Sequence, residues 1–206
     1  MTQAASNIHS KSVSRRAALT GAVAVAVSAP PTSGLADPPR TTDPPRPSGE
    51  PRDGQHDFDF LLGRWKVQLR RLKNPLHGST EWYEGSGTSF ARPLWNGKAQ
   101  VEEIELDTPS GHIQGLTVRL YSTTTRQWSL YWANQKLGHM EVPTIGEFKD
   151  GRGEFFDQEM FEGRSILVRY VWSNITAKSA HFEQSFSPDG GKTWEPNWTT
   201  QMTRIE

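Results

Sequence analysis

From Gly63 to Arg204 the chain alternates short runs of β-branched and aromatic residues with clusters of turn-forming residues, such as Asn96-Gly97 and Lys149-Asp150-Gly151. Runs of about ten residues between such turns, without a sustained helical period, are typical of antiparallel sandwiches and barrels. The pattern predicts ten strands, over residues 64–72, 80–91, 98–107, 113–122, 127–134, 143–149, 152–159, 164–173, 179–187 and 193–204. Only residues 56–62 favour a short helix, with Asp57 as its cap.

The period of two along a strand separates the side chains that point inward from those that point outward. The inward sets are Trp65, Val67 and Leu69 in the first strand, Phe182, Gln184 and Phe186 in the ninth, and Trp194, Trp198, Met202 and Arg204 in the last. Further inward sets are Glu102, Ile104 and Leu106, then Trp128, Leu130, Trp132 and Asn134, and then Ile166, Val168, Tyr170 and Trp172. In strand 113–122, Leu116, Val118 and Leu120 lie opposite Thr117, Arg119 and Tyr121. On this assignment Arg169 points outward and pairs across strands with Glu183.

Composition separates the first 55 residues from the rest of the chain. They contain none of the eight Trp, nine Phe and four Tyr residues, because the first aromatic side chain is Phe58. A segment without large apolar side chains cannot offset the entropy cost of ordering its backbone. We therefore expect one folded domain over residues 56–206.

Charge and cysteine content exclude several classes of function. The chain carries 23 basic and 23 acidic residues, of which six and four lie in residues 1–55, so the domain holds 17 and 19. A nearly neutral domain offers no basic face for a nucleic-acid backbone, so nucleic acid is not an expected partner. The absence of cysteine excludes disulfides, thiolate catalysis and cysteine metal sites, whereas it is compatible with either redox compartment.

The N-terminus carries the pattern of an export signal. Ser14-Arg15-Arg16-Ala17-Ala18-Leu19 fits the twin-arginine motif, and an uncharged apolar stretch over residues 20–29 follows it. This stretch is too short to cross a bilayer as a stable helix, which needs about 20 residues. The order of basic pair, apolar stretch and the small-residue site Gly34-Leu35-Ala36 favours a signal peptide over residues 1–36, rather than a chance arginine pair in a disordered tail. Export to the periplasm or the outside of the cell, without an integral membrane segment in the mature chain, is the expectation.

Residues 37–55 contain two copies of Asp-Pro-Pro-Arg, followed by Pro47 and Pro51. Proline-rich runs favour extended conformations and do not pack into a core. We expect this segment to be a disordered tether.

Gly63-Arg64-Trp65 opens the first strand and Arg204 closes the last one. Lipocalin-like (calycin) barrels begin with Gly-x-Trp and pack a late arginine over that tryptophan. Residues 56–65, together with residues 187–198, resemble a bacterial group of exported β-barrel proteins in this superfamily. The resemblance implies a closed antiparallel barrel of about eight to ten strands, lipocalin-like or fatty-acid-binder-like. It also implies a Trp65–Arg204 plug at one end of the barrel and a cavity for an apolar ligand at the other.

Ser187-Pro188-Asp189-Gly190-Gly191-Lys192-Thr193-Trp194 matches the Asp-box pattern S-x-D-x-G-x-T-W. This motif repeats in sialidase propellers, where the aspartate accepts backbone N–H bonds within a hairpin turn. A single copy outside that context predicts a stabilised hairpin and not a sialidase.

Catalytic and metal-binding signatures are missing from the sequence. It contains no Gly-x-Ser-x-Gly elbow, P-loop or dinucleotide fingerprint. No pair among His56, His77, His112, His139 and His181 has the spacing of metal ligands, so neither a metal nor a cofactor is expected. The nitrobindin relatives of the superfamily hold haem through one inward histidine, which keeps haem open as an alternative, although His181 falls on the outward face.

Inward polar residues set among aromatic ones are the candidate ligand site. They are Trp82, Glu84, Glu102, Trp132, Asn134, Tyr170, Gln184 and Trp198. Buried polar groups need partners, which are either one another and bound water or a ligand. The sequence therefore leaves three functions open. The first is binding of a small hydrophobic molecule. The second is a barrel enzyme of isomerase, cyclase or hydrolase type that uses an inward carboxylate and Tyr170. The third is a structural protein with a filled barrel.

Overall fold

The computed structural model describes residues 53–205. The expected signal peptide, residues 1–36, and all but the last three residues of the expected tether lie outside the described residues. The described strands are β1 (Gly63–Leu72), β2 (Trp82–Leu94), β3 (Ala99–Thr108), β4 (Gly111–Ser122), β5 (Gln127–Asn134), β6 (Thr144–Lys149), β7 (Arg152–Phe161), β8 (Arg164–Ser173), β9 (Ser179–Ser187) and β10 (Glu195–Arg204). Two short 3-10 turns, η1 (Asp59–Leu61) and η2 (Trp95–Gly97), precede β1 and β3.

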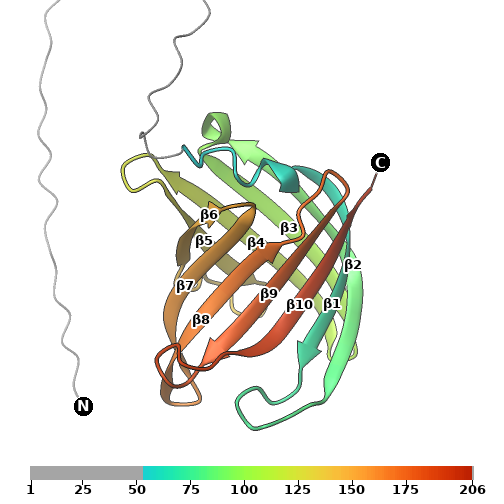
Figure 1. The fold of residues 1–206 in the computed structure, drawn as a ribbon. Coiled ribbons are helices and arrows are strands. Elements are labelled where there is room, and N and C mark those ends of the chain that lie inside the picture. The colour runs from blue at the N-terminus through green and yellow to red at the C-terminus, as the bar shows by residue number, and fades with distance from the viewer. Residues whose placement is uncertain (1–52, 206) are drawn as a thin grey trace, which may run out of the picture. The chain divides into compact units, whose positions relative to one another are not determined.

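The strands form one closed antiparallel barrel (Figure 1). Each strand pairs with its neighbour in sequence, and β1 closes the barrel against β10, with Trp65 opposite Arg204. Closure gives every strand two neighbours, which protects the sheet from edge-to-edge association, although β5 and β6 pair over only three residues each. All ten expected strands are confirmed, because turn-forming residues mark every boundary between them.

The segment that precedes β1 closes one end of the barrel, which we call the plugged end. Phe58 and Leu61 on this segment are fully buried. The backbone N–H of Gly54 donates to Tyr121 Oη, and the indole N–H of Trp128 donates to the Gly54 carbonyl. The helix expected over residues 56–62 is only the single turn η1, because these bonds tie the segment to the barrel wall instead.

Trp65 and Arg204 form the expected plug. The Arg204 guanidinium lies 4.3 Å from the Trp65 ring centroid. Its nitrogens also donate to the carbonyls of Leu62, Phe60 and Ala177, at 2.6, 2.7 and 2.8 Å. Arg204 therefore stabilises the plugged end by a cation–π contact and by three hydrogen bonds, two to the entry to β1 and one to the connection between β8 and β9.

The orientation expected for strand 80–91 is wrong. Glu84 is 80% exposed and pairs with Arg70 at 3.7 Å, and the Arg70 guanidinium also covers the ring of Trp82 on the outer surface. Tyr83, between them, faces the interior. A Cβ at Gly87 would lie 1.8 Å from the Glu105 carbonyl oxygen, so β2 approaches β3 too closely for a side chain there. Most of the larger side chains of β2 therefore lie on the outer face, although the rule that apolar side chains point inward predicts the opposite.

A bulge between Pro196 and Trp198 changes the faces of β10. Trp198 and Met202 point inward as expected, but Trp194 lies outside, 6.0 Å from the Phe156 ring and 4.5 Å below the Arg169 guanidinium. Asn197, expected on the outer face, is buried in the bulge. One extra residue in the strand inverts the alternation on its N-terminal side.

In β4 the inward face is the more polar of the two. Thr117, Arg119 and Tyr121 are buried, whereas the side chains between them are only half-buried on the outer face. On the outer face of β8 and β9, Arg169 Nη2 lies 3.9 Å from Glu183 Oε1, as expected for this cross-strand pair.

The Asp-box forms the predicted hairpin between β9 and β10. Asp189 Oδ1 accepts hydrogen bonds from the backbone N–H groups of Lys192 and Thr193 and from Ser187 Oγ, while Oδ2 accepts one from Thr193 Oγ1 at 2.7 Å. These bonds, led by those from Thr193, lower the pKa of Asp189 to about 2. The motif acts as a turn clamp.

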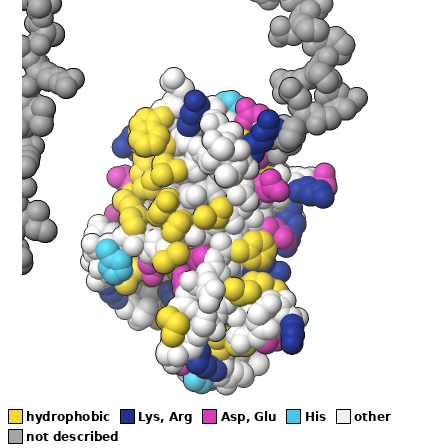
Figure 2. All heavy atoms as spheres, turned by 90° about the vertical axis from the view of Figure 1, so that its left-hand side faces the viewer, with side chains coloured by type: hydrophobic (Ala, Val, Ile, Leu, Met, Phe, Trp, Pro, Cys, Tyr) yellow, Lys and Arg dark blue, Asp and Glu magenta, His cyan; other side chains and the backbone are white. Residues whose placement is uncertain are grey.

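One face of the barrel, over β6, β7 and the connection before β6, exposes apolar side chains (Figure 2). Val142, Ile145, Phe156 and Met160 are each more than two-fifths exposed. This apolar surface is continuous with the barrel interior, because Met160 also lines the cavity described below. Within residues 53–205, no helix is both long enough and apolar enough to cross a membrane.

Candidate functional site

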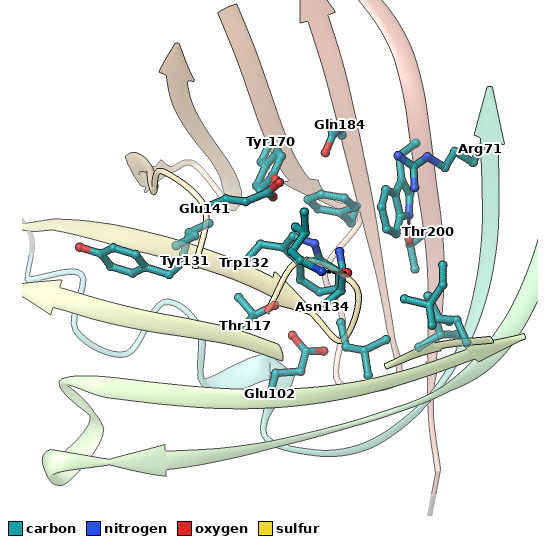
Figure 3. A pocket seen from close by; sticks show the side chains of 18 of the residues that line it. Arg71, Glu102, Thr117, Tyr131, Trp132, Asn134, Glu141, Tyr170, Gln184 and Thr200 are labelled. Atoms are coloured by element: carbon teal, nitrogen blue, oxygen red, sulfur yellow. Dashed lines mark hydrogen bonds between the residues drawn. The ribbon is translucent and has the colours of Figure 1, made fainter. Parts of the chain in front are cut away.

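The barrel encloses a cavity of about 510 Å³. It extends from the middle of the barrel to the end opposite the plug, which we call the open end, where Ser110, Leu137 and Phe161 border it. Apolar and aromatic side chains make up most of the cavity wall, and charged and polar side chains such as Arg71, Glu102 and Glu141 interrupt it (Figure 3). This is the usual make-up of a small-molecule site, and it contradicts the filled-barrel alternative.

A buried ion pair lies at the inner end of the cavity. Glu102 on β3 and Arg119 on β4 are 1% and 2% exposed, and Arg119 Nη2 donates to Glu102 Oε2. Arg119 Nη1 donates to Gln100 Oε1, and its guanidinium lies 5.0 Å from the Phe58 ring centroid. The two charges neutralise each other, so this end of the cavity carries no free carboxylate for acid–base chemistry.

Two tryptophans form an aromatic wall. The rings of Trp132 on β5 and Trp198 on β10 meet edge to face with centroids 6.1 Å apart. Gly115 makes room for the first of them, since a Cβ at this position would lie 2.1 Å from the Trp132 ring. The Arg71 guanidinium covers the Trp198 ring at 4.7 Å. An apolar ligand body would therefore contact flat aromatic surfaces here.

Asn134 and Gln184 are the two predicted amides of the site, and both have partners within the protein. Asn134 Oδ1 accepts the backbone N–H groups of Lys136 and Leu137, so it shapes the turn after β5. Gln184 Nε2 donates to Asn197 Oδ1 at 2.8 Å. Their remaining polar atoms face the cavity, where Figure 3 places both side chains.

Tyr170 on β8 brings a hydroxyl into the cavity. Its ring packs edge to face on Phe182 at 5.2 Å, and its hydroxyl has no hydrogen-bond partner among the described residues. Burial, and then the negative charges of Glu159, Asp157 and Glu141, raise the pKa of Tyr170. The hydroxyl therefore keeps its proton at neutral pH and is available as a hydrogen-bond donor.

Three carboxylates act on this hydroxyl through their charge: Asp157 and Glu159 on β7, and Glu141 in the connection between β5 and β6. Desolvation and the charges of Glu159 and Glu141 raise the pKa of Asp157 to about 7. Desolvation also raises the pKa of Glu159 and of Glu141. In Figure 3 the Glu141 side chain lies next to Tyr170.

Six of the eight residues predicted for the site line the cavity: Glu102, Trp132, Asn134, Tyr170, Gln184 and Trp198. Trp82 and Glu84 lie on the outer surface. Sequence reasoning missed Arg71, Glu141, Asp157 and Glu159. Asp157 and Glu159 share a face of β7 with the fully buried Phe155, but the opposite face carries Phe156 and Met160, so alternation in the sequence does not identify which face points inward.

Histidine is missing from the cavity. Among the described residues that line it, none is a histidine, and His181 lies on the outer surface with Gln201 as its cross-strand neighbour. The haem alternative therefore has no axial histidine in residues 53–205. Within the same residues, no group of three or more His, Asp and Glu side chains is arranged to hold a metal ion.

No protein-family model matches the chain, and no curated protein matches it. Among solved structures, the chain is similar to the S-type phycobiliprotein lyase CPES from Guillardia theta, with 14% identity and a TM-score of 0.49 over 76% of this chain and 99% of that one. It is also similar to a redesigned β-barrel, mFAP0, bound to DFHBI, with 14% identity and a TM-score of 0.39 over 70% of this chain and 99% of that one. At this level of similarity the function has to be argued from the cavity itself. The assignment of a closed ten-stranded antiparallel barrel stands on the strand pairing.

Proposed function

We propose that this protein is an exported, lipocalin-like barrel that binds a small, largely hydrophobic molecule in its interior. The observation that carries this proposal is the cavity of about 510 Å³, walled by aromatic and aliphatic side chains and open at one end. A cavity of this size is large enough for an organic molecule with several rings, and burial of apolar surface contributes about 25 cal/mol per Å².

Two further features support the proposal. The Trp65–Arg204 plug and the closed barrel agree with what the lipocalin-like resemblance implies. The twin-arginine motif supports export, because this route carries proteins that have already folded and therefore permits a ligand acquired before export. Replacement of both Arg15 and Arg16 by lysine should keep the precursor inside the cell, and unchanged export of that variant would refute this part of the proposal.

Binding is tested by isothermal titration of the purified full-length chain with N-phenylnaphthylamine, a hydrophobic probe that is uncharged at neutral pH. We expect one probe per chain. Thr117→Phe places a ring in the cavity and should weaken binding by about tenfold or more, since each 1.4 kcal/mol is a factor of ten. Val118→Phe adds the same ring to the outer face of the same strand and is the matched control.

Equal effects of the two substitutions, or no binding to the unmodified chain, would overturn the proposal. Native mass spectrometry of the protein exported by its own host gives an independent answer, because a retained small molecule adds its mass to the folded chain.

A barrel enzyme is the second candidate, and one observation favours it. Asp157, with a pKa of about 7, acts through its charge on the protonated hydroxyl of Tyr170, so an acid–base group that titrates near neutral pH lies beside the cavity. Glu102 and Glu84 do not fit the role of the catalytic carboxylate, since Glu102 is ion-paired and Glu84 lies on the outer surface of the barrel. Asp157→Asn and Tyr170→Phe should each abolish turnover of a confirmed substrate, and undiminished turnover in both would remove this candidate.

A further inference from the structure

The carboxylates of Asp157, Glu159 and Glu141 have no ion pair or side-chain hydrogen bond among the described residues. Glu141 and Glu159 line the cavity, and Asp157 shares the inward face of β7 with Glu159. Both carboxylate oxygens of Asp157 are completely buried without a partner. A buried polar group without a partner costs about 1–3 kcal/mol, and more when it is charged. The protein therefore keeps an unpartnered buried carboxylate on the face of β7 that turns toward the cavity.

The charges that face this cluster do not neutralise it. The positive charges of His139 and, more weakly, of Arg71 on β1 oppose the desolvation that raises the pKa of Glu141, but Arg71 lies over the Trp198 ring and forms no ion pair with the carboxylates. His139 acts on Glu141 from an exposed position in the same connection. Lys136 also borders the cavity, in an exposed position at the open end. Tyr170 contributes a neutral hydroxyl on the β8 side.

A cationic ligand would supply what this cluster lacks. A carboxylate ligand would add a fourth negative charge, and a neutral ligand would leave Asp157 without a counter-ion. A metal ion does not fit, because no three acidic or histidine side chains in the described residues are arranged to hold one. The aromatic rings of Trp132 and Trp198 add a surface that attracts both apolar groups and organic cations.

We propose that the ligand is a hydrophobic organic amine, whose protonated nitrogen pairs with Glu159 and Glu141 at the cavity wall and is attracted by the charge of the neighbouring Asp157, while its apolar body packs against Trp132 and Trp198. This inference rests on the proposed function, since it names the class of molecule that the cavity binds. It assigns the deep Glu102–Arg119 pair no part in recognition, because that pair is already neutral.

The test uses three probes with the same aromatic body: naphthylmethylamine, naphthylmethanol and naphthoate. Their binding to the full-length chain is measured by isothermal titration at pH 8, where Asp157 is ionised. Charge-assisted hydrogen bonds contribute about 1.5–3 kcal/mol, so we expect the amine to bind about tenfold or more tightly than the alcohol, and naphthoate to bind weakest.

Two variants test which carboxylates cause the preference for the amine over the alcohol. Asp157→Asn and Glu159→Gln should each reduce amine affinity by about tenfold while leaving alcohol affinity within about twofold, because only the charge interaction is removed. Glu147→Gln makes the same charge change on the exposed face of β6 and should leave the affinities for both probes unchanged. The alcohol also reports on folding, since a collapsed cavity would lose both probes.

Protonation of Asp157 should make the preference for the amine over the alcohol depend on pH. Between pH 8 and pH 5.5 the amine stays protonated, whereas Asp157, with its pKa of about 7, loses its charge. Amine affinity should therefore fall with decreasing pH, and alcohol affinity should not.

The outcomes separate this inference from the proposed function. If the alcohol binds as tightly as the amine, the cavity binds hydrophobic molecules but the cationic ligand is wrong. If the amine preference survives in both Asp157→Asn and Glu159→Gln, the assigned carboxylates are wrong. If none of the three probes binds, the proposed function falls together with this inference.

Discussion

Glu102 and Arg119 form a buried ion pair whose contribution to stability depends on both partners being present. Both side chains are buried and linked by a direct ion pair, and the Arg119 guanidinium also stacks on the Phe58 and Trp172 rings. Desolvation of two charges is costly, so such a pair adds little net stability over an apolar pair of the same size. Removal of one partner alone, however, leaves the other charge buried and uncompensated.

Glu102→Met should therefore reduce the free energy of unfolding by about 3–5 kcal/mol. The double variant Glu102→Met with Arg119→Met should recover most of this loss, to within about 1 kcal/mol of the unmodified chain. Urea unfolding of the three proteins, followed by tryptophan fluorescence, measures both values. A double variant that is less stable than the single one would show that the pair itself is favourable.

At the scale of elements, the segment over residues 53–62 decides whether the barrel has a closed end. Phe58 is completely buried and contacts the rings of Trp128, Phe148 and Phe155. Its replacement by alanine leaves a cavity under the plug, so Phe58→Ala should cost about 3–5 kcal/mol in urea unfolding. Phe156→Ala, which removes a ring that is 43% exposed on the outer face, should cost about 1 kcal/mol or less. Similar losses in the two variants would mean that the plug does not support the core.

The strands could be predicted from sequence, but the orientation of some of them could not. Turn-forming residues end every strand, and this local signal does not depend on which face is buried. Faces were assigned on the rule that apolar side chains point inward, and this rule failed in β2, where close strand approach leaves the inner positions to glycine. It also failed at the bulge in β10, because an inserted residue has no signature in a period of two.

The rule that apolar side chains point inward also explains why the three carboxylates of the site were not predicted. In β7 the inner face holds Phe155, Asp157 and Glu159, and the outer face holds Phe156 and Met160. The outer face is the more apolar one, so alternation alone does not identify the carboxylates as internal. Glu141 lies in a connection, where no alternation exists. Where a cavity keeps polar side chains inside a barrel, the rule that apolar side chains point inward assigns the wrong face of the strand to the interior.

For the whole molecule, the cavity carboxylates couple stability to pH. Asp157 has a pKa of 3.8 in an unfolded chain and about 7 in the barrel, so the folded state holds a proton that the unfolded state has released between these values. Folding in this range takes up a proton, and stability therefore falls as pH rises from about 4 to about 7 and levels off above it. The raised pKa values of Glu159 and Glu141 act in the same direction.

Asp157→Asn removes the main titrating group and should be more stable than the unmodified chain at pH 8. Each pKa unit corresponds to at most about 1.4 kcal/mol, and solvent screening reduces that value because the Asp157 side chain as a whole is only half-buried, although its two oxygens do not contact solvent. We expect the advantage of the variant to grow by about 1–2 kcal/mol between pH 5 and pH 8, measured by urea unfolding at both values. A constant difference would show that Asp157 ionises as freely in the barrel as in the unfolded chain. A bound amine should oppose this trend, because it stabilises the ionised carboxylate, and the chain saturated with naphthylmethylamine should therefore lose less stability with rising pH than the free chain.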